Sequence, residues 1–423
     1  MKNIAIIGTG ISGLTCAYLL AKKHKVTIFE KNNYIGGHTA TKDVVVNNKS
    51  YAIDTGFIVC NDKTYPNFLK LLKQINVKLQ PTEMSFSVFN KKTNLEYNGH
   101  TLNSLFAQRS NIFNIKFWLL INQIVKFNKR CKELYVGNDI SERETLGDFL
   151  REQGFSDYFK QNYILPMGAA IWSTSLIEME AFPLQFFIRF FHNHGLLNIT
   201  DRPQWYVIPG GSREYIKPLT ETVANNIELN SKICYVERHA HHIDIVFENG
   251  VIQTFDDVIF ACHSDQALSL LKVPTPDEID ILGDIPYSAN EVVLHTDTNL
   301  LPTRKLAWAS WNYLLDNTSN DEQLTRPSCV TYNMNILQGL TDTDETFCVT
   351  LNQTENIDPS KIIDTYHYHH PVFNQQSLRA QSRRSEICGH NNTHFAGAYW
   401  HNGFHEDGVV SALVVAKRFG VTL

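Results

Sequence analysis

The sequence predicts an α/β fold in which two domains are interleaved along 423 residues. Three observations carry this prediction. A short apolar run, a glycine turn and an apolar helix open the chain; a long helical and aromatic stretch follows; and strands with glycine turns return near residue 205 and again near the end. A chain of this length favours two or three domains and can bury a sizeable core.

The opening unit has the spacing of a dinucleotide-binding fingerprint. Gly8, Gly10 and Gly13 form G-x-G-x-x-G between an apolar strand and a helix, and Glu30 closes the next strand seventeen residues after Gly13. In such a unit the glycines let the backbone approach a pyrophosphate, the helix N-terminus offers free N–H groups, and the carboxylate binds the ribose hydroxyls. The spacing predicts a Rossmann-like unit, and the acid at Glu30 argues against a 2′-phosphate.

Two later glycine turns favour FAD over NAD. Gly36 and Gly37 follow the second strand directly, where an NAD domain would normally enter the connection toward its third strand. Asp54, Thr55 and Gly56 then give a second tight approach of the backbone. Either turn alone would be ordinary, but together they predict FAD.

The middle of the chain predicts a helical, aromatic insertion that walls a pocket. Its helix at 112–127 is apolar on most of its circumference, which favours burial in the core over contact with a membrane surface. Strands in the style of the opening unit return later, and the chain closes with a glycine-rich loop and a buried helix. The predicted FAD-binding domain is 1–60, 205–270 and 385–423, and the predicted substrate domain is 61–204 and 271–384.

The amino-acid composition indicates which classes of partner and which cellular compartment to expect. The net charge of −5 provides no field that would attract nucleic acid, and 43% apolar with 19% charged residues is an ordinary globular balance. Eight scattered cysteines without a C-x-x-C pair indicate a reducing compartment. No apolar run fits a signal peptide or the ~20 residues of a membrane span. We expect a cytoplasmic enzyme without a transmembrane segment, and contact with a membrane surface stays open.

Two histidine-rich stretches, at 239–242 and 367–370, raise the question of a metal site. Along a strand, His239 and His241 would share one face while His242 lies on the other. No compact set of ligands follows from that arrangement, so we predict no metal site.

Taken together, the motifs resemble the superfamily of FAD-dependent amine oxidases, phytoene desaturases and protoporphyrinogen oxidases. The resemblance implies a Rossmann-like FAD-binding domain with an interleaved α+β substrate domain. It also implies that the closing helix points its N-terminal amides, around Gly408 and Val409, at the flavin pyrimidine ring, while Gly397 and Gly403 let the backbone pass the ribityl chain. The implied FAD contacts are Gly8, Gly10, Ile11, Ser12, Gly13, Glu30, Lys31, Gly36, Gly37, His38, Thr55, Gly56, Phe57, Val236, Gly397, Gly403, Gly408 and Val409.

The segments DTGFIVCN, WYVIPGGSREY and GFHEDG are most similar to the flavoprotein half of plant cyclopropane fatty acid synthases and its stand-alone bacterial relatives. That likeness implies an apolar or acyl-lipid substrate and a possible lipid methyltransferase partner. Two positions depart from the wider superfamily. His38 stands where many members have arginine, and Glu291 lies where amine oxidases commonly place a lysine.

The expected activity is removal of hydride from a fatty acyl chain or lipid by an FAD-dependent oxidoreductase. Amine oxidation remains an alternative, as does a non-catalytic flavoprotein that supports a lipid methyltransferase. The sequence identifies no catalytic base. In GFHEDG, Asp407 is expected to cap the closing helix, while His405 could touch the flavin edge or the substrate.

Overall fold

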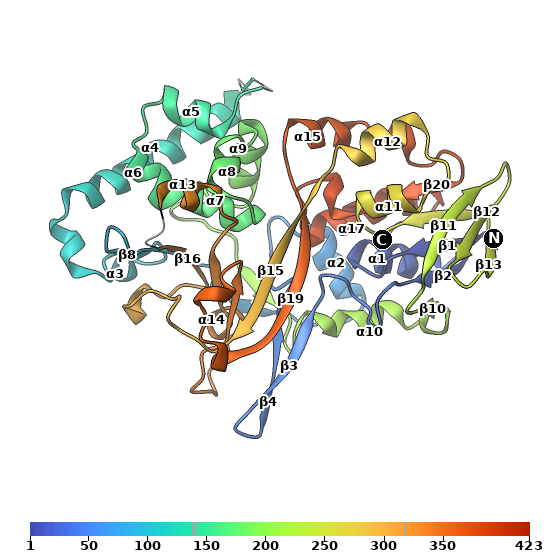
Figure 1. The fold of residues 1–423 in the computed structure, drawn as a ribbon, viewed down its shortest axis with the longest axis horizontal. Helices are drawn as coiled ribbons and strands as arrows, with labels where there is room; N and C mark the ends of the chain where they lie inside the picture. The colour runs from blue at the N-terminus through green and yellow to red at the C-terminus, as the bar shows by residue number, and fades with distance from the viewer. Residues whose placement is uncertain (138–139, 142, 317–318) are drawn as a thin grey trace.

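The computed structural model describes every residue except 138–139, 142 and 317–318. It has two lobes, and the long strands β15 and β19 run between them (Figure 1). Both chain termini lie in the lobe that holds the parallel sheet, on the right in this view. In the described part of the chain, no helix is long and apolar enough to cross a bilayer.

The right-hand lobe is built on a five-stranded parallel sheet in the order β10-β2-β1-β14-β20. Its central strands are almost wholly apolar, as expected for a sheet covered on both faces. Helices α1 and α17 pack on each other beside it, and Phe29 of β2 meets Phe247 and Phe255 of a three-stranded antiparallel sheet. The elements are β1 (Asn3–Ile7), α1 (Ile11–Leu20), β2 (Lys25–Phe29), β10 (Ile227–Glu228), β11 (Ile233–Arg238), β12 (Ile243–Phe247), β13 (Ile252–Phe255), β14 (Asp257–Phe260), β20 (Thr393–Phe395) and α17 (His405–Arg418).

The left-hand lobe combines a seven-stranded mixed sheet with a group of helices. The strand order is β19-β15-β18-β17-β16-β7-β8, and all pairs are antiparallel except β16 with β7. Segments far apart in sequence therefore share one sheet, as interleaved domains require. The strands are β7 (Phe86–Asn90), β8 (Leu95–Asn98), β15 (Tyr287–His295), β16 (Trp311–Leu315), β17 (Val330–Asn333), β18 (Cys348–Leu351) and β19 (Ile362–Pro371).

The helices of this lobe bury an aromatic core in which Phe127, Phe159 and Phe187 are fully enclosed. Capping boxes at Thr145 and Ser175 start two of these helices, because each hydroxyl accepts a backbone N–H that the helix leaves unpaired. The helices are α3 (Leu102–Leu105), η1 (Arg109–Phe113), α4 (Ile115–Gly137), α5 (Leu146–Glu152), α6 (Asp157–Phe159), η2 (Lys160–Ile164), α7 (Leu165–Trp172), α8 (Leu176–Glu180), α9 (Leu184–Asn193), α13 (Asn320–Thr325) and α14 (Met334–Gln338).

Smaller elements join the lobes or cover them. The hairpin β3–β4 lies between the lobes (Figure 1), and the sheet β5-β9-β6 links three distant segments. These elements are β3 (Thr41–Val46), β4 (Lys49–Asp54), β5 (Cys60–Asn61), α2 (Pro66–Gln74), β6 (Gln80–Thr82), β9 (Trp205–Val207), η3 (Ser212–Tyr215), α10 (Ile216–Thr220), η4 (Ala224–Asn226), α11 (Ser264–Leu270), α12 (Pro276–Gly283), η5 (Lys305–Ala307), η6 (Thr354–Asn356), η7 (Pro359–Lys361), α15 (Gln375–Ser382), α16 (Arg384–Ile387) and η8 (Ala398–Trp400).

The core places two segments differently from the sequence prediction. Ile281 and Leu282 of α12 and Ala380 of α15 pack in the core of the parallel-sheet lobe, although 271–384 was assigned to the substrate domain. Tyr51 and Ile53 of β4 pack instead with the aromatic core of the other lobe, although 1–60 was assigned to the FAD-binding domain. The chain alternates between the lobes more often than its glycine turns indicated.

The helix expected at 112–127 is longer and less buried than predicted. It runs as α4 to Gly137 and buries Phe117, Leu120 and Phe127 on one face, while Trp118 and Leu119 on another face are half exposed. The prediction that α4 buries its apolar residues in the core is therefore wrong for the face that carries Trp118 and Leu119.

Candidate functional site

Several of the predicted site residues meet at the carboxyl edge of the parallel sheet. Gly8 follows β1, Glu30 follows β2 and Gly397 comes two residues after β20. His263, which the sequence analysis did not single out, follows β14 at the same edge. Ligands of open parallel sheets bind outside the carboxyl ends of the strands, so the topology itself selects this edge.

The three glycines of the first turn serve different steric needs. A Cβ on Gly13 would lie 2.0 Å from the carbonyl oxygen of Gly8, and a Cβ on Gly8 would lie 2.8 Å from that of Ala261. A Cβ on Gly10 would meet nothing within 4 Å. Gly10 is the N-cap of α1 and has no side chain, so no N-cap side chain occupies the amides that open α1. That arrangement suits an anion held by the helix N-terminus.

The Glu30 carboxylate is buried and fixes the glycine turn. One oxygen accepts hydrogen bonds from the Thr9 amide at 3.0 Å and the Thr9 hydroxyl at 2.6 Å, and the other accepts from the Asn32 amide at 2.9 Å. A carboxylate has about four acceptor sites, so a ribose hydroxyl can still bind. Glu30 therefore holds the turn in shape, and the exposed Lys31 follows it.

The second pair of glycines lies over the first turn. A Cβ on Gly37 would lie 3.2 Å from the Cα of Gly10, and the Gly36 amide donates to the Thr9 hydroxyl at 3.1 Å. Both glycines have positive φ, +127° at Gly36 and +59° at Gly37. The turn from Thr55 to Phe57 packs behind it: a Cβ on Gly56 would lie 2.1 Å from the His38 carbonyl oxygen, to which the Phe57 amide donates at 2.8 Å.

His38, His263 and His370 form a cluster beside these turns, which we call the histidine cluster. The His38 ring centroid is 6.1 Å from that of His263 and 5.5 Å from that of His370. Burial, followed by repulsion from neighbouring imidazoles, lowers the pKa of His263 and of His370 to about 3. Burial also lowers the pKa of His38, whose Nε2 atom is buried without a hydrogen-bond partner among the described residues. An anion at this place would relieve both the repulsion and the unpaired nitrogen.

The opening turn of α17 is held by its own acids. The Asp407 carboxylate accepts from the Phe404 amide at 2.9 Å, which confirms the predicted cap, and burial raises its pKa to about 7. Glu406 instead accepts from the amides of Asn67 and Phe68 at 3.1 and 2.8 Å, so it caps α2. His405 stacks on Phe57 with ring centroids 3.6 Å apart.

His405 also belongs to a buried network of hydrogen bonds. Its Nε2 lies 3.0 Å from the Tyr215 hydroxyl and 3.2 Å from the Thr39 hydroxyl, and these two hydroxyls bond to each other. Burial holds the pKa of His405 well below its usual range. The ring is thus a neutral partner in a network that ties α17 to the segment after Gly37.

Side-chain packing explains why glycine stands at three positions of the closing segment, and the sequence alone does not show this packing. A Cβ on Gly408 would lie 2.6 Å from the Ile11 Cγ2 atom and 3.0 Å from the Ser12 hydroxyl, so Gly408 faces α1. Gly403 has φ +94° and its Cβ would meet the Phe373 ring at 3.2 Å, while a Cβ on Gly397 would lie 2.1 Å from the Tyr399 ring. Contact of these glycines with the flavin stays a prediction, and Gly408 has a packing reason as well, its contact with α1.

Two other predicted positions lie further along the chain. Val236 is buried in β11, where its carbonyl accepts from the Lys272 amide at 3.0 Å. Glu291 lies in β15 opposite His367, and its amide donates to the Asn352 side chain at 3.0 Å.

The first histidine-rich stretch is arranged differently from the prediction. β11 ends at Arg238 and a turn follows, closed by a hydrogen bond from the His239 amide to the His242 carbonyl at 2.9 Å. The two rings therefore stack, with centroids 4.4 Å apart, and one potential ligand atom from each of His239, His242 and Asp244 lies within 4.8 Å of the other two. The expectation that these histidines cannot form a compact set is wrong, because the turn replaces the strand geometry assumed for it.

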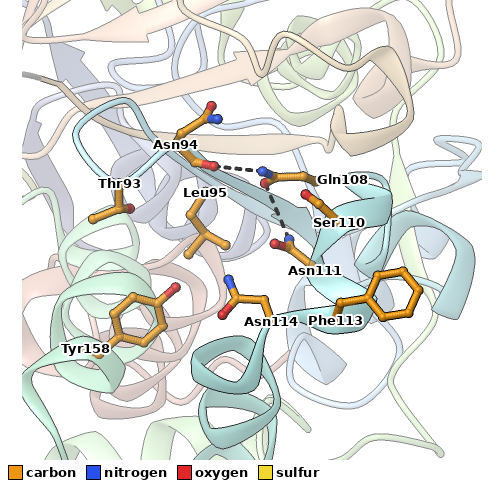
Figure 2. Close-up of a pocket in the computed structure, with 9 residues that line it drawn as sticks. All are labelled: Thr93, Asn94, Leu95, Gln108, Ser110, Asn111, Phe113, Asn114 and Tyr158. Carbon is orange, nitrogen blue, oxygen red and sulfur yellow. Dashed lines mark hydrogen bonds between the residues drawn. The ribbon is translucent and has the colours of Figure 1, made fainter.

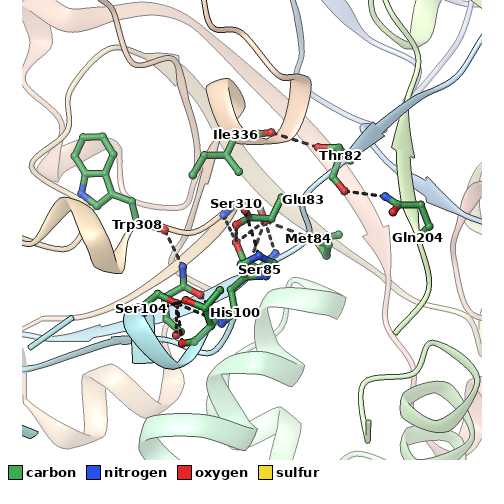
Figure 3. A network of polar contacts seen from close by, with 12 residues as sticks. Thr82, Glu83, Met84, Ser85, His100, Ser104, Gln204, Trp308, Ser310 and Ile336 are labelled. Carbon is green, nitrogen blue, oxygen red and sulfur yellow. Dashed lines mark hydrogen bonds and ion pairs between the residues drawn. The ribbon is translucent and has the colours of Figure 1, made fainter. Parts of the chain in front are cut away.

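Two surface pockets open elsewhere, on the other lobe. One, of about 330 Å³, is lined by polar side chains between β8 and α4, including Gln108, Asn111 and Asn114 (Figure 2). The other, of about 400 Å³, adjoins the polar network in which Ser85 and Ser310 exchange hydrogen bonds between β7 and the start of β16 (Figure 3). Neither includes a residue predicted to contact the cofactor.

Comparison with known proteins agrees with this architecture. The model of the family described as flavin containing amine oxidoreductase matches residues 11–419. Cyclohexylamine oxidase from Brevibacterium oxydans has a similar fold, with a TM-score of 0.71, 13% identity and 99% of each chain covered. A CLA-producing fatty acid isomerase from P. acnes aligns over 99% of this chain and 98% of its own, with a TM-score of 0.70 and 15% identity.

Among the curated proteins, a 1-hydroxycarotenoid 3,4-desaturase from Flavobacterium sp. is 36% identical over 98 residues. That match covers 23% of this chain and only 18% of the desaturase.

Proposed function

Because this chain belongs to the family of flavin containing amine oxidoreductases, and is therefore an FAD-dependent oxidoreductase, we propose that it removes hydride from a largely apolar substrate, a fatty acyl chain or lipid. The observation that carries the substrate class is an aromatic wall that reaches the start of α17. Phe190 of α9 stacks on Phe404, the N-cap of α17, with ring centroids 5.2 Å apart. Phe186 stacks on Phe373 at the same separation, 5.2 Å.

This wall would favour an apolar chain and exclude water. Trp172 lies against Phe182 and Phe190 at 4.4 and 4.8 Å, so the rings form one buried aromatic cluster behind the contact with α17. Burial of apolar surface is worth about 25 cal/mol per Å², which favours an alkyl chain over a small charged amine here. The names of the fatty acid isomerase and the carotenoid desaturase agree with an apolar substrate.

The residues at the sheet edge fit the cofactor. The amides of Ile11 and Ser12 would donate to the diphosphate, because a Cβ on the neighbouring Gly10 would meet nothing within 4 Å. The histidine cluster would donate to it as well, because the Nε2 of His38 has no hydrogen-bond partner among the described residues. Glu30 would accept from the adenosine ribose. Bound FAD supplies the acceptor for the hydride, and the chain supplies position, electrostatics and exclusion of water.

The experiment that tests the proposal is anaerobic titration of the holoenzyme with candidate substrates. We expect long-chain fatty acids or their lipid esters to bleach the flavin absorption, at rates that rise with chain length. Cyclohexylamine and putrescine serve as the amine comparison, and Glu291 in place of the lysine common in amine oxidases leads us to expect no bleaching by either.

The alternatives have distinct outcomes. Bleaching by amines and not by lipids would establish an amine oxidase and reject the proposal. If dithionite reduces the flavin while neither lipids nor amines do, a non-catalytic role beside a lipid methyltransferase, as the likeness to cyclopropane fatty acid synthases implied, becomes the better explanation.

A further inference from the structure

The outer edge of the left-hand lobe carries large apolar side chains in contact with solvent. Five of them lie within eight residues at the junction of η1 and α4, and we call them the α4 patch. Their exposed fractions range from 45% to 88%: Ile112 45%, Phe113 88%, Ile115 76%, Trp118 50% and Leu119 53%. Figure 1 shows α4 at the edge of the molecule opposite the chain termini. Contiguous exposed apolar groups of this kind mark interaction surfaces on soluble proteins.

The patch is held rigidly outward. Phe117 and Leu120, on the opposite face of α4, are fully buried and anchor the helix. The Trp118 indole donates to the Ile112 carbonyl at 2.8 Å and its ring lies 5.4 Å from that of Phe106. The apolar side chains therefore cannot turn inward without breaking the packing of the helix.

The segment of the chain that carries the patch is basic. Between Tyr97 and Lys132 the chain has no aspartate or glutamate and six basic residues, whereas the whole chain carries a net charge of −5. Lys116 lies within the patch, and Lys126 and Lys129 continue the exposed face of α4 beyond it. The six are Arg109, Lys116, Lys126, Lys129, Arg130 and Lys132.

Among the described residues, an acid pairs with this basic segment at the end of α4 that lies away from the patch. Glu133 pairs with Arg130 at 2.6 Å and lies 4.0 Å from Lys129. Lys126 donates to the Gln153 carbonyl at 2.6 Å, a neutral partner. The surface near Lys116 and Arg109 therefore stays positive, because Arg109 donates only to the neutral groups of Asn103 and Phe106 among the described residues.

We infer that the α4 patch docks on the surface of an anionic lipid bilayer. Exposed aromatic and aliphatic side chains would enter the boundary between headgroups and acyl chains, while the basic residues of α4 lie over the anionic headgroups. Tryptophan at such a boundary keeps its ring in the apolar layer and its N–H near polar groups. The polar pocket beside Phe113, with the amides of Gln108, Asn111 and Asn114, lies at the headgroup level (Figure 2).

A second copy of the chain fits this surface less well. A two-fold symmetric contact would bring the same patch of each copy together, and with it the basic residues of both. Like charges facing one another across an interface oppose association. An anionic bilayer complements the patch in both charge and apolarity, so the inference commits to it.

The test is flotation of the purified, flavin-loaded protein with lipid vesicles. We expect binding to vesicles of phosphatidylcholine with phosphatidylglycerol, little binding to phosphatidylcholine alone, and weaker binding as salt rises. The double variant Phe113→Ser, Ile115→Ser should lower the partition into anionic vesicles by about tenfold or more, since each side chain is largely exposed and loses its burial in lipid. Lys116→Gln with Lys129→Gln should remove most of the preference for the anionic lipid.

The matched control is Val273→Ser with Ile199→Ser, two apolar side chains that are 74% and 67% exposed on other segments. These changes should leave vesicle binding unchanged, and all variants should keep their flavin and melting temperature. Absence of binding to anionic vesicles, or binding that the patch variant does not weaken, would reject the inference. A dimer detected by sedimentation without lipid would also reject the inference if only the patch variant dissociates it. None of these results depends on the substrate proposed above.

Discussion

At the scale of single residues, His38 is the group on which retention of the cofactor should depend most. Its Nε2 is buried and has no hydrogen-bond partner among the described residues, and its ring lies beside the other histidines of the cluster. A hydrogen bond to a charged group is worth about 1.5–3 kcal/mol, so His38→Ala should weaken FAD binding by about ten- to a hundred-fold. His38→Arg should restore most of the affinity, because a guanidinium also donates to phosphate.

The dissociation constant of FAD from the apoprotein, followed by flavin fluorescence, measures this effect. His242→Ala serves as the control, since that histidine lies in the turn after β11, away from the cluster. Equal affinities of the wild type and His38→Ala would show that the ring plays no part in binding the diphosphate.

Glu30 is a residue at which the structure changes the expected phenotype. The sequence predicts a ribose ligand, but the carboxylate also accepts three hydrogen bonds that hold Thr9 and Asn32. Glu30→Ala would leave the Thr9 amide unpaired in the interior, at a cost of about 1–3 kcal/mol. We therefore expect a lower melting temperature of the apoprotein as well as weaker FAD binding.

Glu228 on the neighbouring strand β10 is exposed, so Glu228→Ala should change neither quantity. If Glu30→Ala lowers FAD affinity and leaves the thermal stability of the apoprotein unchanged, the hydrogen bonds to Thr9 contribute nothing and Glu30 acts only as a ligand.

At the scale of elements, the contact between α1 and α17 positions both helix N-termini. A Cβ on Gly408 would lie 2.6 Å from the Ile11 Cγ2, so Gly408→Ala forces the helices apart. Overpacking of this kind costs about 1–3 kcal/mol, and it would shift the amides that we assign to the diphosphate. Both the melting temperature and FAD retention should fall.

A double variant separates this clash from other causes. Ile11→Ala removes the atom nearest to the new Cβ, so Gly408→Ala with Ile11→Ala should be more stable than the sum of the two single changes predicts. Val414→Ala, at a half-exposed position of the same helix, is the control for a general loss of helix stability. If the changes in the free energy of unfolding of the two single variants add up to that of the double variant, the steric explanation is contradicted.

The sequence predicted elements well where local pattern and burial agree. The turn at Gly8, the strand before it and the helix after it follow from spacing alone, and the steric need at Gly13 is local, since its Cβ would lie 2.0 Å from the Gly8 carbonyl oxygen. Prediction failed where tertiary context decides. The helix from Ile115 has apolar residues on both faces, and periodicity cannot tell which face the rest of the protein covers.

The candidate site shows the same limit. His263 stands in no motif, and His370 stands out only as part of a histidine-rich stretch that suggests a metal site. Tertiary packing, which spacing does not show, brings both rings beside His38. Gly408 was noticed, but its neighbours Ile11 and Ser12 are almost four hundred residues away in sequence. Contacts over such separations cannot be derived from one chain without an alignment.

At the scale of the whole molecule, cofactor binding and acid stability should be linked through the histidine cluster. In the folded protein without FAD, the pKa of His263 and of His370 is about 3, below the ordinary value of 6.5. The unfolded chain therefore binds more protons than the folded one as pH falls below about 6.5. The stability that these groups contribute is fully present above that pH and is lost as pH falls toward 3.

Bound diphosphate should oppose this loss. A nearby anion raises the pKa of an imidazole, so the histidines of the holoprotein can take up protons without unfolding. We therefore expect the difference in melting temperature between holoprotein and apoprotein, at fixed excess FAD, to widen as pH falls from about 7.5 to about 5.5.

Differential scanning fluorimetry of holoprotein and apoprotein across this pH range measures the difference in melting temperature. Titration calorimetry in two buffers of different ionisation enthalpy should show net proton uptake on FAD binding at the lower pH. His263→Gln with His370→Gln should flatten the pH dependence, whereas His239→Gln with His242→Gln, which changes the same number of histidines in the turn after β11, should not. A constant difference between the two forms, without proton uptake, would mean that the diphosphate does not lie beside the cluster. The cofactor would then have to be held at the sheet edge by the helix amides alone.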